Sequence, residues 1–392
     1  MAEIGLIKNG AVYIRNGRVA AVGRRSSVRR MPGATRARTI EATDAVVLPG
    51  FVDSHTHALF VGTRVDEYVA RLRGATYEEI AEAGGGIQAS AARLRRASPS
   101  SLVEHLVRVA PLFFEYGTTT AEVKSGYGLD VRQELKMLEA IRHAARRTPF
   151  EFVPTVLCHD VPAALKTDRG RYVKQVMDWL LPTVAGRRLA EFCDVFCDRG
   201  YFTVAEAKRM LKAAGGAGLK LKLHAEQLAH TGAARMAAAL NAVSVDHADH
   251  IGDVDMAALE KHGTIATLLP GSTFHLGDHR YAPARRLIER GIPVALATNF
   301  NPGSSPTLNM QMILSLACSQ MRMMPSEAIV AATFNGAHAV GRADRLGSLE
   351  RGKQADLVIM DVTDYREIPY FFAMNHCRMV IKNGRVVYAR ER

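Results

Sequence analysis

The sequence is poor in cysteine and in aromatic residues, and it has no long apolar run. Its five cysteines are scattered along 392 residues and odd in number, which argues against a disulfide framework and favours a reducing compartment. No apolar run approaches the roughly 20 residues that a membrane-spanning helix needs, so we expect no integral membrane protein. The first residues lack the basic stretch and apolar core of a secretory signal, and we therefore expect a cytoplasmic protein.

Acidic residues are in the minority: 39 Asp and Glu stand against 51 Lys and Arg, a formal net charge of +12. The arginine clusters are spread over most of the chain, aromatic residues make up only 7% of it, and we find no nucleic-acid-binding motif. A solvated basic surface that attracts small anions is therefore favoured over nucleic-acid binding. With 48% hydrophobic and 23% charged residues the chain is globular, and its length suits one large barrel or two domains.

The two ends of the chain share one pattern. Residues 4–23 contain short β-branched runs broken by Asn-Gly pairs, and residues 379–388 repeat it. Because the turn chemistry matches, we expect the two ends to pair with each other. The prediction is one small β-sandwich domain formed from residues 1–48 and 345–392.

The central part of the chain alternates strand-like runs with helical patterns such as residues 133–147 and 204–214. Eight such units within about 300 residues predict an α/β fold, a (β/α)8 TIM-type barrel over residues 49–344. The predicted strands are 51–57, 118–125, 151–159, 191–198, 219–224, 242–247, 264–269 and 294–299.

Polar residues gather at the ends of these predicted strands, where a barrel forms its active-site mouth. They are His55 and His57 on the first strand, His159 on the third, His224 on the fifth, His247 on the sixth and Asn299 on the eighth. His55 and His57 point the same way because alternate residues of a strand share a face, so both imidazoles can reach one metal ion. Two structurally hydrogen-bonded histidines are the alternative, but the further histidine His224 strengthens the metal interpretation.

Two signature motifs resemble those of the amidohydrolase superfamily: residues 48–57, Leu-Pro-Gly-Phe-Val-Asp-Ser-His-Thr-His, and residues 347–357 near the C-terminus. Within the superfamily, the chain resembles the imidazolonepropionases over nearly its whole length. This narrower likeness rests on residues 71–80, 84–87, 124–129, 224–227 and 299–304. It implies metal-dependent hydrolysis of the cyclic amide C–N bond of 4-imidazolone-5-propanoate to N-formimino-L-glutamate, in histidine degradation. It also implies one divalent or trivalent ion, zinc or iron, in each subunit of a homodimer.

The resemblance also implies roles for individual positions. The implied metal ligands are His55, His57, His224 and Asn299. The implied substrate contacts are Arg64, Tyr77, Tyr127, His159, Gln227, Asn301, Gly303 and Ser304. Arg64 suits a propanoate carboxylate, because a guanidinium makes two-pronged ion pairs. Tyr127 and Gln227 suit the polar atoms of a ring, and His159 suits polarisation of a ring carbonyl.

Asn299 departs from the family pattern, which has an aspartate at this metal-binding position. An amide oxygen can coordinate a metal but cannot accept a proton, so activity should fall sharply if that carboxylate relays the nucleophile's proton. Asn299 is an inactivating substitution, a natural variant with another base, or the mark of a degenerate enzyme. His247, beside the metal, and Glu226 are candidate substitute bases, although Glu226 could instead cap a helix. Only 54 residues precede His55, fewer than the resemblance leads us to expect.

Two other functions stay open. The nearer one is another cyclic-amide hydrolase or deaminase of the superfamily whose substrate lacks a carboxylate, for which Arg64 would matter little. The other is a catalytically inactive barrel that acts as a binding protein, which Asn299 favours. Lys124 faces inward on the second predicted strand, but no lysine bridge between two metals is implied, and one metal is the simpler interpretation.

Overall fold

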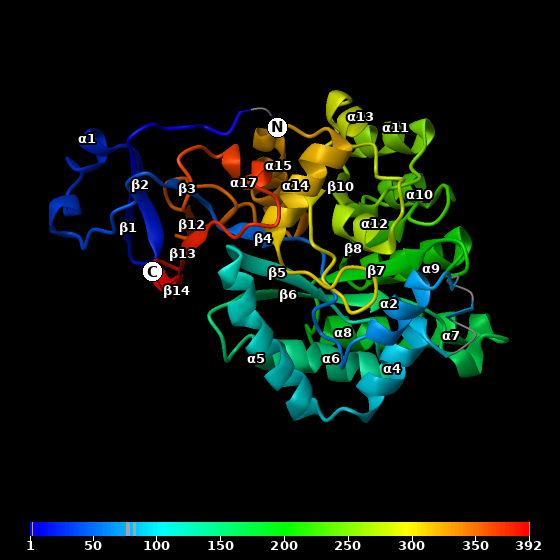
Figure 1. The fold of residues 1–392 in the computed structure, drawn as a ribbon. Coiled ribbons are helices and arrows are strands. Elements are labelled where there is room, and N and C mark those ends of the chain that lie inside the picture. The colour runs from blue at the N-terminus through cyan, green and yellow to red at the C-terminus, as the bar shows by residue number, and fades with distance from the viewer. Residues whose placement is uncertain (2, 76–78, 81–83, 392) are drawn as a thin grey trace.

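The computed structural model describes residues 1, 3–75, 79–80 and 84–391, which form three sheets (Figure 1). The largest is an eight-stranded parallel sheet in which neighbouring strands follow the chain order from β4 to β11. Its strands are β4 (Phe51–Asp53), β5 (Thr118–Lys124), β6 (Glu151–Cys158), β7 (Phe192–Cys197), β8 (Lys220–Ala225), β9 (Ser244–His247), β10 (Ile265–Leu268) and β11 (Val294–Leu296). The eight predicted strands are thereby confirmed, with edges that differ by a few residues.

The sheet closes into a barrel where the last strand meets the first. Asn299 donates its backbone N–H to the carbonyl oxygen of His55 at 3.1 Å, and His57 donates its own to that of Phe300 at 2.9 Å. Nearby, the carboxylate of Asp53 accepts the backbone N–H and the hydroxyl of Thr298, at 3.0 and 2.5 Å. Closure at this end brings the residues that follow β4 beside those that follow β11.

Helices surround the barrel (Figure 1). They are α2 (Val65–Leu72), α4 (Gly86–Arg96), α5 (Pro99–Glu115), α6 (Val131–Ala144), α7 (Arg169–Gln175), α8 (Leu181–Gly186), α9 (Val204–Gly216), α10 (Ala233–Ala239), α11 (Asp253–His262), α12 (Pro270–Leu276), α13 (Ala284–Glu289), α14 (Met310–Met321), α15 (Pro325–Ala332) and α16 (Phe334–Ala339). The two helices predicted by residue range are confirmed as α6 and α9. Helix α6 begins earlier than predicted because the Asp130 side chain accepts the N–H of Gln133 at 2.9 Å and caps it.

Strands from both ends of the chain form the small β part, as predicted. A four-stranded antiparallel sheet has the order β14 (Arg385–Ala389), β13 (Cys377–Lys382), β12 (Leu357–Met360) and β3 (Val46–Pro49). The hairpin of β1 (Gly10–Arg15) and β2 (Arg18–Arg24) turns at Asn16 and Gly17, with φ of 53° and 74°. Backbone bonds between Val19 and the segment 352–353 tie this hairpin to the C-terminal part.

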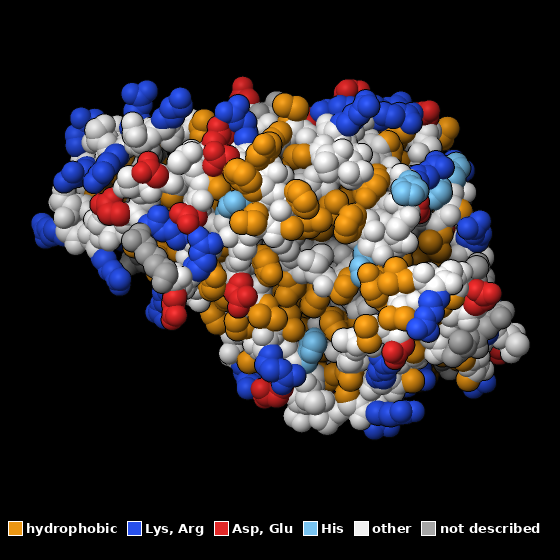
Figure 2. All heavy atoms as spheres, viewed as in Figure 1, with side chains coloured by type: hydrophobic (Ala, Val, Ile, Leu, Met, Phe, Trp, Pro, Cys, Tyr) orange, Lys and Arg blue, Asp and Glu red, His pale blue; other side chains and the backbone are white. Residues whose placement is uncertain are grey.

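The short helices are α1 (Arg25–Val28) and α17 (Glu367–Tyr370), with the single turns η1 (Ala34–Arg36), η2 (Ala163–Leu165) and η3 (Val176–Leu180). Lys and Arg side chains are spread over much of the face drawn in Figure 2, and apolar side chains gather across its middle. No helix among the described residues combines the length and the apolar content that a bilayer crossing requires.

Candidate active site

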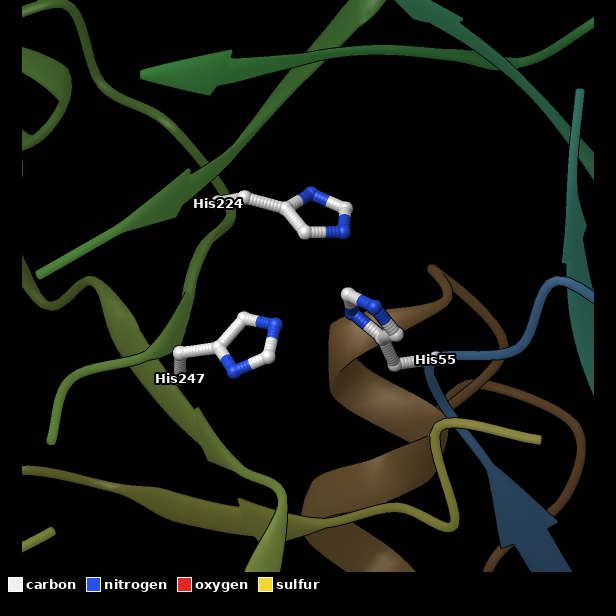
Figure 3. Close-up of side chains that lie close together, drawn as sticks. All are labelled: His55, His224 and His247. Atoms are coloured by element: carbon white, nitrogen blue, oxygen red, sulfur yellow. The ribbon is translucent and has the colours of Figure 1, made fainter. Parts of the chain in front are cut away.

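Four histidines converge at the C-terminal ends of the barrel strands. His55 lies just beyond β4, with its ring centroid 4.4 Å from that of His224 in β8 and 5.2 Å from that of His57. The ring of His247, at the end of β9, lies 5.4 Å from that of His224. Figure 3 shows the rings of His55, from the segment after β4, His224, from β8, and His247, from the end of β9, turned toward a common centre. The sequence prediction that histidines meet at the barrel mouth is thus met by the geometry.

The spacing of these nitrogens suits a shared cation. His55, His224 and His247 each offer a nitrogen within 4.8 Å of the others. The Nε2 atoms of His57 and His224 are 3.4 Å apart. Two imidazoles bound tetrahedrally to one zinc ion at about 2.1 Å would have their nitrogens about 3.4 Å apart. Both observations fit one ion at this point.

Buried polar atoms without partners mark the same place. In the described part of the chain, these atoms include His55 Nε2, His57 Nδ1, His224 Nδ1, His247 Nδ1 and Asn299 Oδ1. Buried polar atoms in proteins nearly always have a hydrogen-bond partner, so a group of orphaned nitrogens and an amide oxygen calls for one. His55 Nε2 and Asn299 Oδ1 would find that partner in a metal ion, and imidazole nitrogen with amide oxygen is a donor set that zinc and iron accept.

Three of these histidines are held in their neutral form. Burial is the main cause that lowers the pKa of His55, His57 and His224 well below the usual value. The ammonium of Lys124 lowers the pKa of all three further. A neutral imidazole keeps a lone pair on one nitrogen, which is the form that binds a metal.

Two carboxylates, those of Asp246 and Asp194, lie next to the rings of His55 and His224. Asp246 Oδ2 is 2.6 Å from His55 Nδ1, so the neutral ring donates its Nδ1–H to the carboxylate and keeps the lone pair of Nε2 for an ion. Asp194 accepts the backbone N–H of His224 at 3.1 Å. Its other oxygen is 3.0 Å from His224 Nδ1, outside hydrogen-bond geometry.

These carboxylates belong to a fully buried cluster inside the barrel, which we name the barrel-centre ion network. It consists of Glu122, Lys124, Asp194, Lys222 and Asp246. The ammonium of Lys124 lies 2.7 Å from Asp194 and 2.8 Å from Glu122, and that of Lys222 lies 2.9 Å from Glu122. Glu122 and Asp246 also group with His55 as potential ligands, but both carboxylates already pair with the two ammonium groups, Glu122 at 2.8 and 2.9 Å and Asp246 at 3.5 and 3.7 Å. Of this network, sequence analysis identified only the inward-facing Lys124.

His159 lies beside the cluster, with its ring stacked on that of His57 at 5.2 Å and 5.5 Å from that of Tyr127. Burial lowers the pKa of His159 to about 4, which keeps its ring neutral at physiological pH. Its Nδ1 is 3.2 Å from the carbonyl oxygen of Gly126, which can only accept, so Nδ1 carries the proton. Nε2 is then an acceptor that suits a ring N–H, whereas polarising a carbonyl would need the other tautomer.

Arg64, which precedes α2, packs against the loop that follows β11. The guanidinium lies so close to Gly303 that a Cβ there would collide with it. Glu67 accepts the Nε–H of Arg64 at 2.8 Å and, with its other oxygen, the backbone N–H of Gly86 at 3.1 Å. Arg71 donates to the carbonyl oxygen of Gly303 at 3.2 Å. Glu67 and Arg71 were not foreseen, although they follow Arg64 at helical spacing.

Asn301 gives the same loop its shape. Its Oδ1 accepts the backbone N–H groups of Gly303 and Ser304, both at 2.8 Å, and its Nδ2 donates to the carbonyl oxygen of Asn299 at 2.6 Å. These bonds occupy the side chain within the loop. Asn301 therefore places Gly303 and Ser304 at the barrel mouth.

The remaining predicted residues follow β8. Gln227 is half-buried, and its backbone N–H donates to Asp198 at 2.7 Å. Glu226 is fully buried, and its carboxylate accepts the backbone N–H groups of Thr231 at 2.6 Å and Ala234 at 3.2 Å. This arrangement matches the helix-capping alternative for Glu226, at the start of α10. Tyr77 lies outside the described residues.

Comparison with known proteins agrees with this geometry. Residues 202–387 match the amidohydrolase family model. The chain is 46% identical over 390 residues to an imidazolonepropionase of Geobacillus kaustophilus, covering 99% of this chain and 92% of that protein. An imidazolonepropionase of Solibacter usitatus is also 46% identical, with 100% and 93% covered.

Solved structures share the fold at low identity. A zinc-bound adenosine deaminase of Xanthomonas campestris has a TM-score of 0.73 at 20% identity, over 97% of this chain and 88% of that one. An Escherichia coli guanine deaminase has a TM-score of 0.68 at 17% identity, over 98% and 93%. These two likenesses concern the fold alone, whereas the sequence relatives are close and full-length. The chain therefore belongs to the amidohydrolase family and, within it, to the imidazolonepropionases.

Proposed function

We propose that this chain hydrolyses the cyclic amide C–N bond of 4-imidazolone-5-propanoate to give N-formimino-L-glutamate, with one zinc or iron ion. The observation that carries the proposal is the convergence of His55, His57 and His224 at the mouth of a barrel whose family relatives are imidazolonepropionases. When bound, the ion supplies Lewis-acid chemistry, which acidifies water and polarises a carbonyl. The ligands we propose are these three histidines and the amide oxygen of Asn299.

The residues around the ion then bind and orient the substrate. Arg64, fixed by Glu67, holds the propanoate carboxylate in a charge-assisted pair. The acceptor nitrogen of His159 takes a ring N–H, and Tyr127 lies beside it to confine the ring. Gln227, Gly303 and Ser304 line the rest of the proposed substrate site with amide, backbone and hydroxyl groups.

Proton transfer is assigned to His247. Glu226 is unsuited because its carboxylate already accepts two backbone N–H groups. His247 is buried beside His224, its Nδ1 has no hydrogen-bond partner among the described residues, and Asp249 lies 3.8 Å away. An imidazole next to the reacting carbonyl can take a proton from water and return it to the leaving ring nitrogen.

The test is loss of imidazolone absorbance with the purified chain, after chelation and after add-back of zinc or iron. We expect turnover that depends on the added metal; undiminished turnover in metal-free protein would contradict the proposal. Arg64→Ala should raise KM for the propanoate about tenfold to hundredfold, since a hydrogen bond to a charged group contributes about 1.5–3 kcal/mol. Arg73→Ala, an exposed arginine at the end of α2, is the matched control and should leave KM unchanged.

A binding protein without activity is the second candidate, and Asn299 is the observation that favours it. It predicts that the chain binds the propanoate and the metal while imidazolone absorbance stays constant. A substrate without a carboxylate, turned over equally by the Arg64→Ala variant, would instead indicate another hydrolase or deaminase of the same family.

A further inference from the structure

The proposed ligands of the ion carry no formal charge. His55, His57 and His224 would coordinate a metal through neutral imidazole nitrogens, and Asn299 offers a neutral amide oxygen. All are almost completely buried. A divalent cation in such a place loses its water, and that loss costs free energy unless negative charge lies close by.

Negative charge lies close to the proposed ligands, on carboxylates that contact two of the histidines. Asp246 contacts His55 at 2.6 Å, and Asp194 lies 3.0 Å from the ring of His224. Both belong to the barrel-centre ion network, in which three carboxylates face two ammonium groups. With every member ionised, the network has one negative charge in excess, and all of its side chains are fully buried.

We propose that the barrel-centre ion network supplies the counter-charge of the metal ion, and that Asp246 and Asp194 are the positioning residues through which it acts. The inference rests on the metal site of the proposed function. Asp246 fixes the tautomer of His55 so that Nε2 faces the ion, and Asp194 holds the backbone and flanks the ring of His224. The two lysines limit the excess to a single negative charge.

This assignment predicts opposite effects for opposite charges. Removing a carboxylate from the network makes its total charge neutral and should weaken metal binding. Removing an ammonium doubles the negative excess and should strengthen it. A network that only filled space would behave differently, because losing either kind of partner disrupts the same packing and would weaken binding in both cases.

The experiment measures zinc affinity by competition with a chromophoric chelator at one fixed pH. Asp246→Asn keeps an oxygen that can accept from His55 Nδ1 but removes the charge, and we expect affinity to fall about tenfold or more. Lys124→Met should raise affinity. Asp356→Asn is the matched control: Asp356 is also buried and lies 2.6 Å from Lys382, but it belongs to the small β part. It should lower the melting temperature and leave zinc affinity unchanged.

Two results would overturn the inference: an unchanged zinc affinity in Asp246→Asn, or a loss of affinity in both Asp246→Asn and Lys124→Met. If Lys124→Met does not fold, Lys222→Met removes the other ammonium of the network and carries the same expectation. The readout is independent of catalysis. A chain that binds zinc with these charge effects but does not consume the imidazolone would refute the proposed function and leave this inference intact.

Discussion

Asn299 is the residue that separates the proposed hydrolase from its alternative, a binding protein without activity. It follows β11, its backbone bonds to His55, and its Oδ1 is buried without a hydrogen-bond partner among the described residues. The position is therefore suited to a metal ligand. An amide supplies the ligand oxygen but neither the charge nor the proton-accepting ability of a carboxylate.

We expect Asn299→Asp to raise kcat about 100-fold or more, because a positioned general base contributes about 10²–10⁴-fold. The measurement is the initial rate of imidazolone loss in both proteins, with bound metal quantified in each. Equal rates at equal metal content would contradict this expectation and show that proton transfer by His247 gains nothing from a carboxylate at position 299.

At the residue scale, sequence reasoning could predict the groups that carry a motif. His55, His57 and His224 stood at predicted strand ends, and the structure brings them together. The barrel-centre ion network could not be assembled in this way, because its members come from four strands and meet only through the barrel register. The signal was nevertheless present: charged residues such as Lys222 and Asp246 lie within the predicted barrel strands.

At the scale of elements, the residues of the candidate site lie at the ends of the barrel strands or just beyond them. Glu226, His247 and Asn299 have positive φ of 57°, 83° and 53°, an unusual conformation for residues other than glycine. Sequence reasoning extended the last predicted strand to Asn299, whereas β11 ends at Leu296. Hydrophobic alternation predicts which residues form a strand. It does not predict at which residue the backbone leaves the strand and turns a side chain toward the site.

The connection between β8 and α10 offers a test at this scale. Glu226→Gln removes an acceptor from the backbone N–H groups of Thr231 and Ala234, and we expect the free energy of unfolding to fall by about 1–3 kcal/mol. The pH profile of turnover should keep its shape, since Glu226 acts as a cap. Urea unfolding and a pH–rate series check the two parts.

Glu206→Gln is the matched control for this variant, because Glu206 caps α9 by accepting the backbone N–H of Thr203 at 2.8 Å. It should destabilise the fold to a similar degree and leave turnover unaffected. Unchanged stability with abolished turnover in Glu226→Gln would identify Glu226 as a catalytic base.

At the scale of the whole molecule, the barrel and the small β part are tied together by partly buried ion pairs. Glu151, at the start of β6, contacts Arg342 and Arg345 beyond α16, and it lies 3.5 Å from Lys382 of β13. Burial alone would raise the pKa of Glu151, but these three cations hold it below its usual value. The pairing of the two chain ends was predictable from their turn motifs, whereas sequence analysis did not identify the contacts of Glu151.

The pKa shift has a defined effect on stability. A carboxyl whose pKa is lower in the folded chain stabilises the fold above the unfolded pKa, and this stabilisation is lost as the pH falls through the folded pKa. We expect Glu151→Gln to lower the free energy of unfolding by about 2 kcal/mol at pH 7. Below the usual glutamate value of 4.5, the difference from the parent chain should shrink. Urea unfolding at pH 7 and pH 4 measures both.

The control for this prediction is Glu104→Gln, which breaks the exposed pair between Glu104 and Arg147. Surface ion pairs contribute little, so its unfolding should match that of the parent chain. A Glu151→Gln variant as stable as the parent at pH 7 would show that this contact does not hold the two parts together.

The central claim is that imidazoles from separate barrel strands share one ion. X-ray absorption spectroscopy of the zinc-loaded chain, combined with metal analysis, tests it directly. The account predicts one zinc ion per chain, with histidine nitrogens at about 2.0–2.1 Å and an imidazole signal that weakens in the His224→Ala variant. A chain that binds no zinc, or a zinc spectrum without imidazole scattering, would contradict it.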